Sequence, residues 1–121
     1  MTKRLVVNES EGESFPDICG EAIELINEET AGSTKVSLAK LIIKPGAKSQ
    51  PHFHLLTEEI HFILKGSGVI TIEDKEFKIK PGDAIFLPLK ARHHIWNSGE
   101  ADLVFICADG PVFDSSDVYP D

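Results

Sequence analysis

Turn signals recur along this chain at intervals that leave room only for short strands. Clusters of Gly, Pro, Asn and Asp stand at residues 44–47, 65–68, 73–75, 80–83, 97–100 and 108–111. The runs between them are rich in Val, Ile, Leu and Phe, which favour strands. The expected strands are residues 36–43, 59–64, 69–72, 77–79, 84–87 and 103–108. Short strands with frequent turns predict an all-β sandwich or closed barrel.

Two segments near the termini need separate interpretation. Residues 20–29 contain Glu, Ala and Leu, which favour a helix. However, the alternation within this segment and the Gly-containing turn at residues 30–33 favour a strand that forms a hairpin with residues 36–43, and we expect the strand. The acidic tail, residues 112–121, is expected to lie on the surface or to fray.

Size and charge restrict the class of protein. A chain of 121 residues fits one domain. The formal net charge is −8 and the 12 basic residues form no run, which argues against nucleic-acid and anionic-membrane partners. No stretch approaches the ~20 apolar residues of a membrane span, and no secretory segment is evident, so we predict a cytoplasmic protein. Cys19 and Cys107 lack CxxC spacing and are expected to be reduced.

Histidines supply the main chemical signal. Residues two apart on a strand point to the same face, so His52 and His54 are placed to bind one metal ion together. Taken alone, such a pair of histidines is more often two polar side chains on the solvent-exposed face of a strand. Glu59 follows closely, and His93 comes from a later strand. Three imidazoles and a carboxylate suit one divalent transition metal, namely Mn, Fe, Zn, Ni, Co or Cu.

Two longer runs contain these residues at characteristic spacing. The run from Gly46 to Gly66 reads G-AKSQP-HFH-LLTE-E-IHFILK-G, and the run from Gly82 to Asn97 reads G-DAIFL-P-LKAR-H-HIW-N. They resemble the two sequence motifs of the cupin family. The resemblance implies an all-β, single-domain fold, the cupin double-stranded β-helix or jelly-roll barrel, and implies that the metal ligands are His52, His54, Glu59 and His93.

The resemblance also decides between neighbouring residues. The motif places six residues between its glutamate and its last glycine, Gly66, which selects Glu59 over Glu58. Counting back from Asn97 selects His93 over His94, which is expected to face outward or to pack between strands. One position departs from the second motif. Lys90 stands where that motif usually has a glycine, which puts the turn's conformation in doubt but touches no ligand. Gly46, Gly66 and Gly82 are expected to supply positive φ in turns, and Asn97 to hydrogen-bond at a turn or strand end.

The same resemblance divides the chain and predicts its assembly. Residues 1–34 are assigned to N-terminal strands, 35–110 to the barrel with both motifs, and 111–121 to a C-terminal tail. Small cupins typically pair, so we expect a homodimer in which residues 1–34 form a dimer-exchange segment crossing to the partner's sheet.

Strand parity extends the candidate site beyond the metal ligands. If Glu59 points inward, His61 does too, while Ile60 and Phe62 face the opposite layer. His61 is then either an acid–base group near the metal or a structural histidine bonded to a neighbouring carbonyl. Cys107 is more often a buried inert thiol than a reactive one. The candidate pocket-lining residues are Gln50, Phe86, Ile95, Phe105 and Cys107.

Three functions are compatible with such a site. In the first, the metal acts as a Lewis acid on a small oxygenated metabolite, a keto acid or sugar derivative, in isomerase, epimerase or lyase chemistry with His61 moving a proton. In the second, a redox metal activates dioxygen, as in a dioxygenase or oxidative decarboxylase. In the third, the chain is a non-catalytic small-molecule-binding cupin. The spare imidazole of His61 favours the first.

Overall fold

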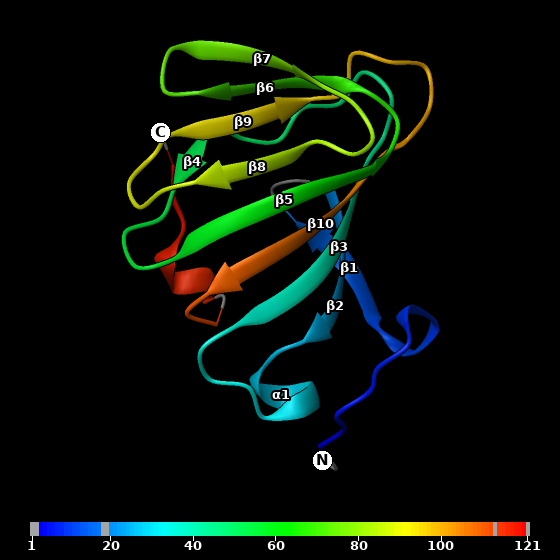
Figure 1. The fold of residues 1–121 in the computed structure, drawn as a ribbon, viewed down its shortest axis with the longest axis vertical. Coiled ribbons are helices and arrows are strands. Elements are labelled where there is room, and N and C mark those ends of the chain that lie inside the picture. Colours follow the sequence, from blue (N-terminus) through cyan, green and yellow to red (C-terminus); the bar gives the residue numbers. More distant parts are fainter. Residues whose placement is uncertain (1–2, 18–19, 113, 121) are drawn as a thin grey trace.

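The chain folds into two antiparallel sheets that face each other across a shared interior (Figure 1). This computed structural model describes residues 3–17, 20–112 and 114–120. The strands are β1 (Glu13–Asp17), β2 (Gly20–Ile26), β3 (Ser37–Ile43), β4 (His52–Phe53), β5 (Glu58–Lys65), β6 (Gly68–Ile72), β7 (Lys75–Ile79), β8 (Ala84–Leu87), β9 (His93–Trp96), β10 (Leu103–Gly110) and β11 (Tyr119–Pro120). The helical segments are short: η1 (Glu9–Glu11), α1 (Glu28–Ala31) and η2 (Ser115–Asp117).

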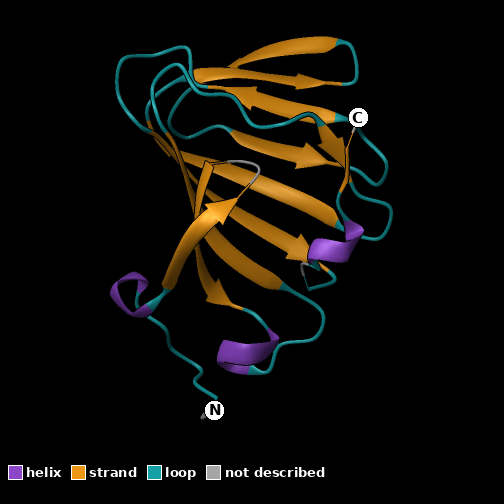
Figure 2. Ribbon diagram, turned by 180° about the vertical axis from the view of Figure 1, so that it is seen from behind, coloured by secondary structure: helices purple, strands orange, loops and turns teal. Residues whose placement is uncertain are grey.

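The sheet order separates the two halves of the barrel. One sheet has the order β1-β2-β3-β10-β5-β8, and the other has the order β11-β4-β9-β6-β7. Strands make up about half of the chain, and the short helices lie at the periphery of the barrel (Figure 2). The expected all-β jelly-roll barrel is therefore confirmed. Among the described residues, no helix is long and apolar enough to cross a membrane.

The six expected strands are all present, with boundaries that differ by no more than a few residues. The hairpin expected before residues 36–43 is also confirmed, because β2 pairs antiparallel with β3. The short helix α1 follows it and was not expected. Asn27 caps this helix by accepting a hydrogen bond from the Thr30 amide at 2.9 Å, and Gly32, with φ of 76°, ends it.

Side chains alternate along β5 as the pattern predicts, with Glu59, His61 and Ile63 buried and Ile60 and Phe62 exposed. The neighbouring strand β10 matches this alternation residue by residue. It sets Phe105 opposite Ile63, Cys107 opposite His61 and Asp109 opposite Glu59. The barrel interior therefore changes character along its length. One end is an apolar core that includes Ile43, Ile63, Ile70, Ile95, Leu103 and Phe105. The other end carries polar and titratable side chains.

Turn residues support this arrangement. Gly46, Gly66 and Gly82 have positive φ, as expected. Lys90 replaces a glycine of the cupin motif and still adopts φ of 68°, so the turn keeps the left-handed conformation. Asn97 is fully buried, and its Nδ2 donates to the carbonyls of Ile43 and Ala101, both at 2.8 Å. Its expected role as a hydrogen-bonder at a strand end is confirmed.

The C-terminal tail differs from the expectation of a surface or frayed segment. Asp117 is buried, and β11 pairs antiparallel with β4, setting Tyr119 opposite Phe53 and Pro120 opposite His52. The rings of Tyr119 and Phe53 stack with centroids 5.4 Å apart. The sequence does not indicate this pairing, because the tail is acidic and its partner strand β4 lies more than sixty residues away in the sequence.

Candidate metal centre

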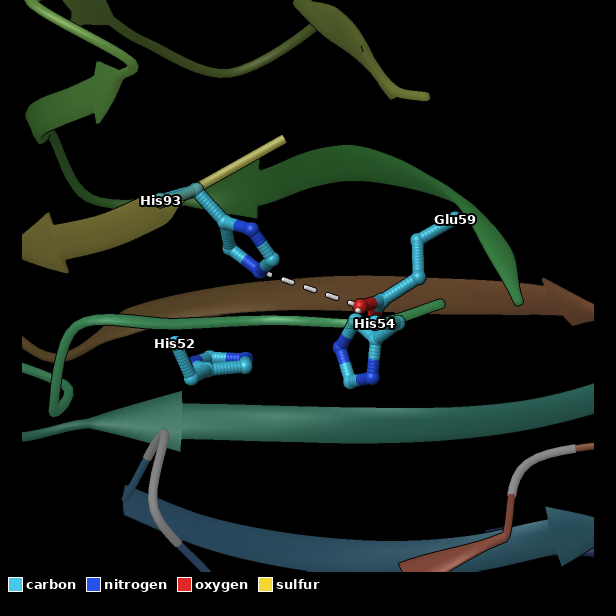
Figure 3. A group of neighbouring side chains, drawn as sticks. All are labelled: His52, His54, Glu59 and His93. Carbon is cyan, nitrogen blue, oxygen red and sulfur yellow. Dashed lines mark ion pairs between the residues drawn. The ribbon is translucent and has the colours of Figure 1, made fainter. Parts of the chain in front are cut away.

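Three histidines and a glutamate meet inside the polar end of the barrel (Figure 3). His52 lies on β4 and His54 directly after it, His93 begins β9, and Glu59 comes from β5 of the facing sheet. All four side chains are buried, and one ligand atom from each lies within 4.8 Å of the others. Glu59 Oε1 is 2.5 Å from His54 Nε2 and 3.8 Å from His93 Nε2. The expected ligands are thus brought together in space.

Each of the three imidazoles is held by a backbone carbonyl. His52 Nδ1 lies 2.7 Å from the Gln50 carbonyl oxygen, and His93 Nδ1 lies 2.9 Å from that of Ala91. His54 Nδ1 lies 2.8 Å from the carbonyl oxygen of Asp117. A carbonyl only accepts hydrogen bonds, so each Nδ1 carries a proton and each Nε2 is directed toward the other ligands. Metal-binding histidines are oriented in this manner in proteins.

Burial and neighbouring charges set the protonation of the cluster. Burial and, after it, the charge of the nearby His52 lower the pKa of His93 to about 4. Burial likewise lowers the pKa of His52. Both rings are therefore neutral at neutral pH, which is the form that binds metal. His93 Nε2 is buried and has no hydrogen-bond partner within the described part of the chain. A divalent metal would satisfy this atom, so the residues fit the ion.

His54 and Glu59 form an ion pair within the cluster. Burial opposes the charged form of His54, but the hydrogen bond and charge of Glu59 outweigh it and raise the pKa of this imidazole. Burial also opposes ionisation of Glu59, but the hydrogen bonds with His54 and His61 hold the pKa of this carboxyl well below its usual range. Glu59 is therefore an anion at neutral pH. A metal ion would replace the proton on His54.

The second oxygen of Glu59 is engaged on the opposite side. Cys107 Sγ donates to Glu59 Oε2 at 2.9 Å, and His61 Nε2 lies 3.4 Å from the same oxygen. The His61 ring rests on Phe105, with centroids 4.8 Å apart. Because Oε2 is held by these neighbours, Oε1 is the oxygen that faces the three histidines. His61 and Cys107 thus orient the carboxylate.

Asp117 is a site residue that sequence reasoning missed. Its carboxylate accepts hydrogen bonds from the amides of Leu55 and Leu56, at 3.0 Å from each. These two residues form the bend between His54 and Glu59. The main-chain carbonyl of Asp117 fixes His54, as described above. No local pattern in the sequence connects this aspartate to the bend, because the contact spans 63 residues.

The cavity beside the ligands has a volume of about 40 Å³. Of the expected ligands and pocket residues, His52, His54, Glu59, His61 and Cys107 line it. Ile95 and Phe105 belong to the apolar core instead. Gln50 and Phe86 are exposed and lie outside the cavity. The side chain of Phe86 points outward from β8. Gln50 precedes β4, so the alternation of side chains counted from His52 does not apply to it.

Other lining residues come from the hairpin β1–β2, from β3 and β10, and from the C-terminal segment. The apolar ones are Ala22, Ala39, Leu41 and Val118, and the acidic ones beyond Glu59 are Asp17, Glu24 and Asp109. Burial and the charge of Glu59 raise the pKa of Asp109 to about 8. Cys107 is buried and forms no disulfide within the described residues, whereas Cys19 lies outside them.

Comparison with known proteins agrees with this fold and site. An uncharacterized protein of Methanocaldococcus jannaschii is 36% identical over 94 residues, which cover 78% of this chain and 75% of that protein. The oxalate-binding protein of Thermotoga maritima is 33% identical over 86 residues, which cover 71% of each chain.

Solved structures extend the comparison. A predicted oxalate decarboxylase from Thermotoga maritima matches with a TM-score of 0.76 and 30% identity, covering 89% of this chain and all of that one. The chain spans only 33% of another match, the capsular polysaccharide assembling protein CapF of Staphylococcus aureus, at a TM-score of 0.76 and 24% identity. The family model Cupin_2, the cupin domain, matches residues 39–109, more than half of the chain. This chain therefore belongs to the cupin family.

Proposed function

We propose that this protein is a metal-dependent enzyme that converts a small oxygenated metabolite by Lewis-acid chemistry of the isomerase, epimerase or lyase type. The observation that carries the proposal is the convergence of three Nε2 atoms and Glu59 Oε1 beside a cavity that also contains His61. A divalent transition metal bound there would supply the positive charge that stabilises an enolate-like oxygen.

The chain's own residues have separable roles in this proposal. His52, His54, His93 and Glu59 hold the ion, and the backbone carbonyls keep their imidazoles in the binding tautomer. His61 lies in the cavity wall, and its buried Nδ1 has no hydrogen-bond partner among the described residues. In this role it takes a proton from the carbon next to a carbonyl and returns it elsewhere. The His61 side chain is only 2% exposed, which would shield that transfer from bulk water.

A second candidate is redox chemistry with dioxygen. It is favoured by one observation, the 30% identity to a Thermotoga maritima protein described as a predicted oxalate decarboxylase. The same ligand set leaves positions for dioxygen as well as for substrate. A non-catalytic binding role is the third alternative, and the name of the oxalate-binding relative supports it.

Proton exchange tests the first proposal without knowledge of the natural substrate. The purified protein, reloaded with Mn, Fe, Co, Ni or Zn, is incubated in deuterated water with dihydroxyacetone and other small hydroxyketones, and deuterium incorporation is followed by NMR. We expect exchange that depends on metal and persists without dioxygen. His61→Gln should abolish exchange while retaining metal.

The matched control is His94→Gln, because His94 is a half-buried neighbour of the ligand His93 that does not line the cavity. It should exchange like the unmodified protein. Oxygen-dependent turnover with no anaerobic exchange would favour the redox candidate. Metal binding with neither activity would favour the binding role. We also propose that the protein acts in the cytoplasm as a homodimer.

A further inference from the structure

The cavity wall opposite the metal ligands is acidic. Asp17 ends β1 and Glu24 lies on β2, so both belong to the hairpin at the edge of the six-stranded sheet. Asp109 lies on β10, directly opposite Glu59. All three side chains line the same cavity as His52, His54 and Glu59. The hairpin thus forms a wall that faces the ligand cluster.

Within the described part of the chain, no lysine or arginine balances this wall. Neither Lys nor Arg occurs among the described residues that line the cavity. Several of the described basic side chains are paired with carboxylates elsewhere: Arg4 with Glu11, Lys40 with Glu9, and Lys44 with Asp102. A bound carboxylate or phosphate is usually held by Arg or Lys, and this cavity offers neither.

The acidic groups already interact unfavourably with one another. Burial raises the pKa of Glu24, and the charge of Asp17 raises it further despite a hydrogen bond with Asn27. A divalent ion bound to Glu59 retains a single net positive charge, because His52 and His93 are neutral. The negative charges of Asp17 and Glu24 together exceed this single positive charge. A ligand with its own negative charge would add repulsion at this wall.

We infer that the cavity selects ligands whose metal-binding end is followed by uncharged hydroxyl or amide groups, and discriminates against carboxylates and phosphates. Carboxylates accept hydrogen bonds and donate none when ionised, so a row of hydroxyl groups complements the wall formed by Asp17 and Glu24. This inference rests on the proposed metal function and narrows its substrate class. It favours a sugar-type hydroxycarbonyl compound over a keto acid, and it distinguishes this chain from its oxalate-binding relative.

Two isosteric probes test the inference directly. Glycolate and glycolamide have the same size and the same hydroxyl group, but only glycolate carries a negative charge. Each is titrated into the cobalt-loaded protein, and binding is followed by the visible absorption of the cobalt and by calorimetry. The test variant is Asp17→Asn/Glu24→Gln. The matched control is Glu13→Gln/Glu21→Gln, which removes two exposed carboxylates from the same two strands outside the cavity.

We expect the test variant to bind glycolate about tenfold more tightly, with the affinity for glycolamide changed less than about twofold. The control should change neither affinity by more than about twofold. The single variant Glu24→Gln should give about half of this change in glycolate affinity on a logarithmic scale. It replaces the double variant in the test if the double variant does not fold.

Two results would overturn the inference in different ways. If cobalt binds but the ratio of glycolate to glycolamide affinity is the same in the test variant and the unmodified protein, the acidic wall does not select the ligand and the metal proposal stands. If no divalent metal binds to the folded protein, the proposed function and this inference both fail.

Discussion

The two carboxylate oxygens of Glu59 contact different sets of polar side chains in the site. Oε1 faces the histidines, and Oε2 is held by Cys107 at 2.9 Å and approached by His61 at 3.4 Å. The carboxylate is 7% exposed, so it depends on these partners for its charge. Its neighbour Glu58 is exposed on the opposite face of β5. Two adjacent glutamates therefore have opposite environments, which permits a matched comparison.

Replacing Glu59 by Gln should lower metal affinity at least about a hundredfold, because the amide keeps the shape but loses the anionic ligand atom. Glu58→Gln should leave affinity within about twofold of the unmodified protein. Affinities are measured by competition with a chromophoric chelator, with circular dichroism to verify folding. A loss of affinity in Glu58→Gln but not in Glu59→Gln would show that Glu58 is the ligand, and unchanged affinity in both variants would show that neither is.

Asp109 makes the stability of the metal-free protein depend on pH. Its pKa is raised by burial and by Glu59 to about 8, above the ordinary 3.8. The folded state therefore retains a proton that the unfolded state releases, and this stabilisation is complete below about pH 4 and lost as pH rises to about 8. One proton corresponds to a slope of at most about 1.4 kcal/mol per pH unit.

Asp109→Asn should flatten this decline in the free energy of unfolding, measured by urea titration of chelator-treated protein at several pH values. The exposed turn residue Asp74 provides the control, and Asp74→Asn should leave the slope unchanged. An unaltered slope in Asp109→Asn would mean that Asp109 is ionised in the folded state.

The residues of the site divide into those that a sequence can indicate and those that it cannot. His52, His54, Glu59 and His61 follow from strand parity and motif spacing, which are local properties. Asp17, Glu24 and Asp117 carry no such pattern, since each is one acidic residue among 20 and only the packing of distant segments brings it to the site. The structure places Gln50 and Phe86 outside the cavity that they were expected to line. The alternation of side chains stops at the end of a strand, which explains Gln50. It also does not tell which face of a separate strand points inward, which explains Phe86.

At the scale of elements, the C-terminal segment η2–β11 is part of the metal centre. The carboxylate of Asp117 holds the bend at Leu55 and Leu56, and its carbonyl orients His54. The strand β11 is only two residues long, and its acidic surroundings give no hydrophobic periodicity. Longer strands such as β3 and β10 were predictable because alternating apolar residues specify them without reference to distant partners.

Asp117→Ala should reduce metal affinity about 10-fold to 100-fold, the range found when residues that orient metal ligands are removed. The fold should persist, since the core lies at the other end of the barrel. Metal affinity by chelator competition is the measurement, and the exposed Glu100→Ala is the control. If affinity is unchanged, the Asp117 carboxylate does not position the bend between His54 and Glu59 for metal binding.

At the scale of the molecule, the outer face of the six-stranded sheet is apolar. Ile60, Phe62 and Leu64 of β5 and Phe86 of β8 are 52%, 45%, 41% and 54% exposed. Ile60 lies opposite Phe86 in the register, so these side chains form one continuous patch. The closed β-architecture was predictable from turn spacing. The apolar patch could not be predicted from the sequence. The alternation of side chains separates the two faces of a strand, but it does not show whether another part of the protein covers the outer face.

This patch is the surface on which we expect the homodimer to form. Ile60→Lys should convert the protein to a monomer by desolvating a charge at the interface, as measured by light scattering with multiple-angle detection. Lys65→Glu, at the exposed end of the same strand, is the control and should remain dimeric. A monomeric unmodified protein would refute the homodimer, and a dimeric Ile60→Lys variant would place the interface elsewhere.

The docked tail also bears on when the candidate metal site is completed during synthesis. His52 and His93 obtain their carbonyl partners from residues two positions earlier, so both are oriented as soon as the local chain forms. His54 waits for Asp117, which leaves the ribosome 63 residues later. A nascent or truncated chain that ends before Asp117 would hold its ion weakly. Asp117 is translated well after the four candidate ligands, so the site that would hold the ion is complete only once synthesis has passed Asp117.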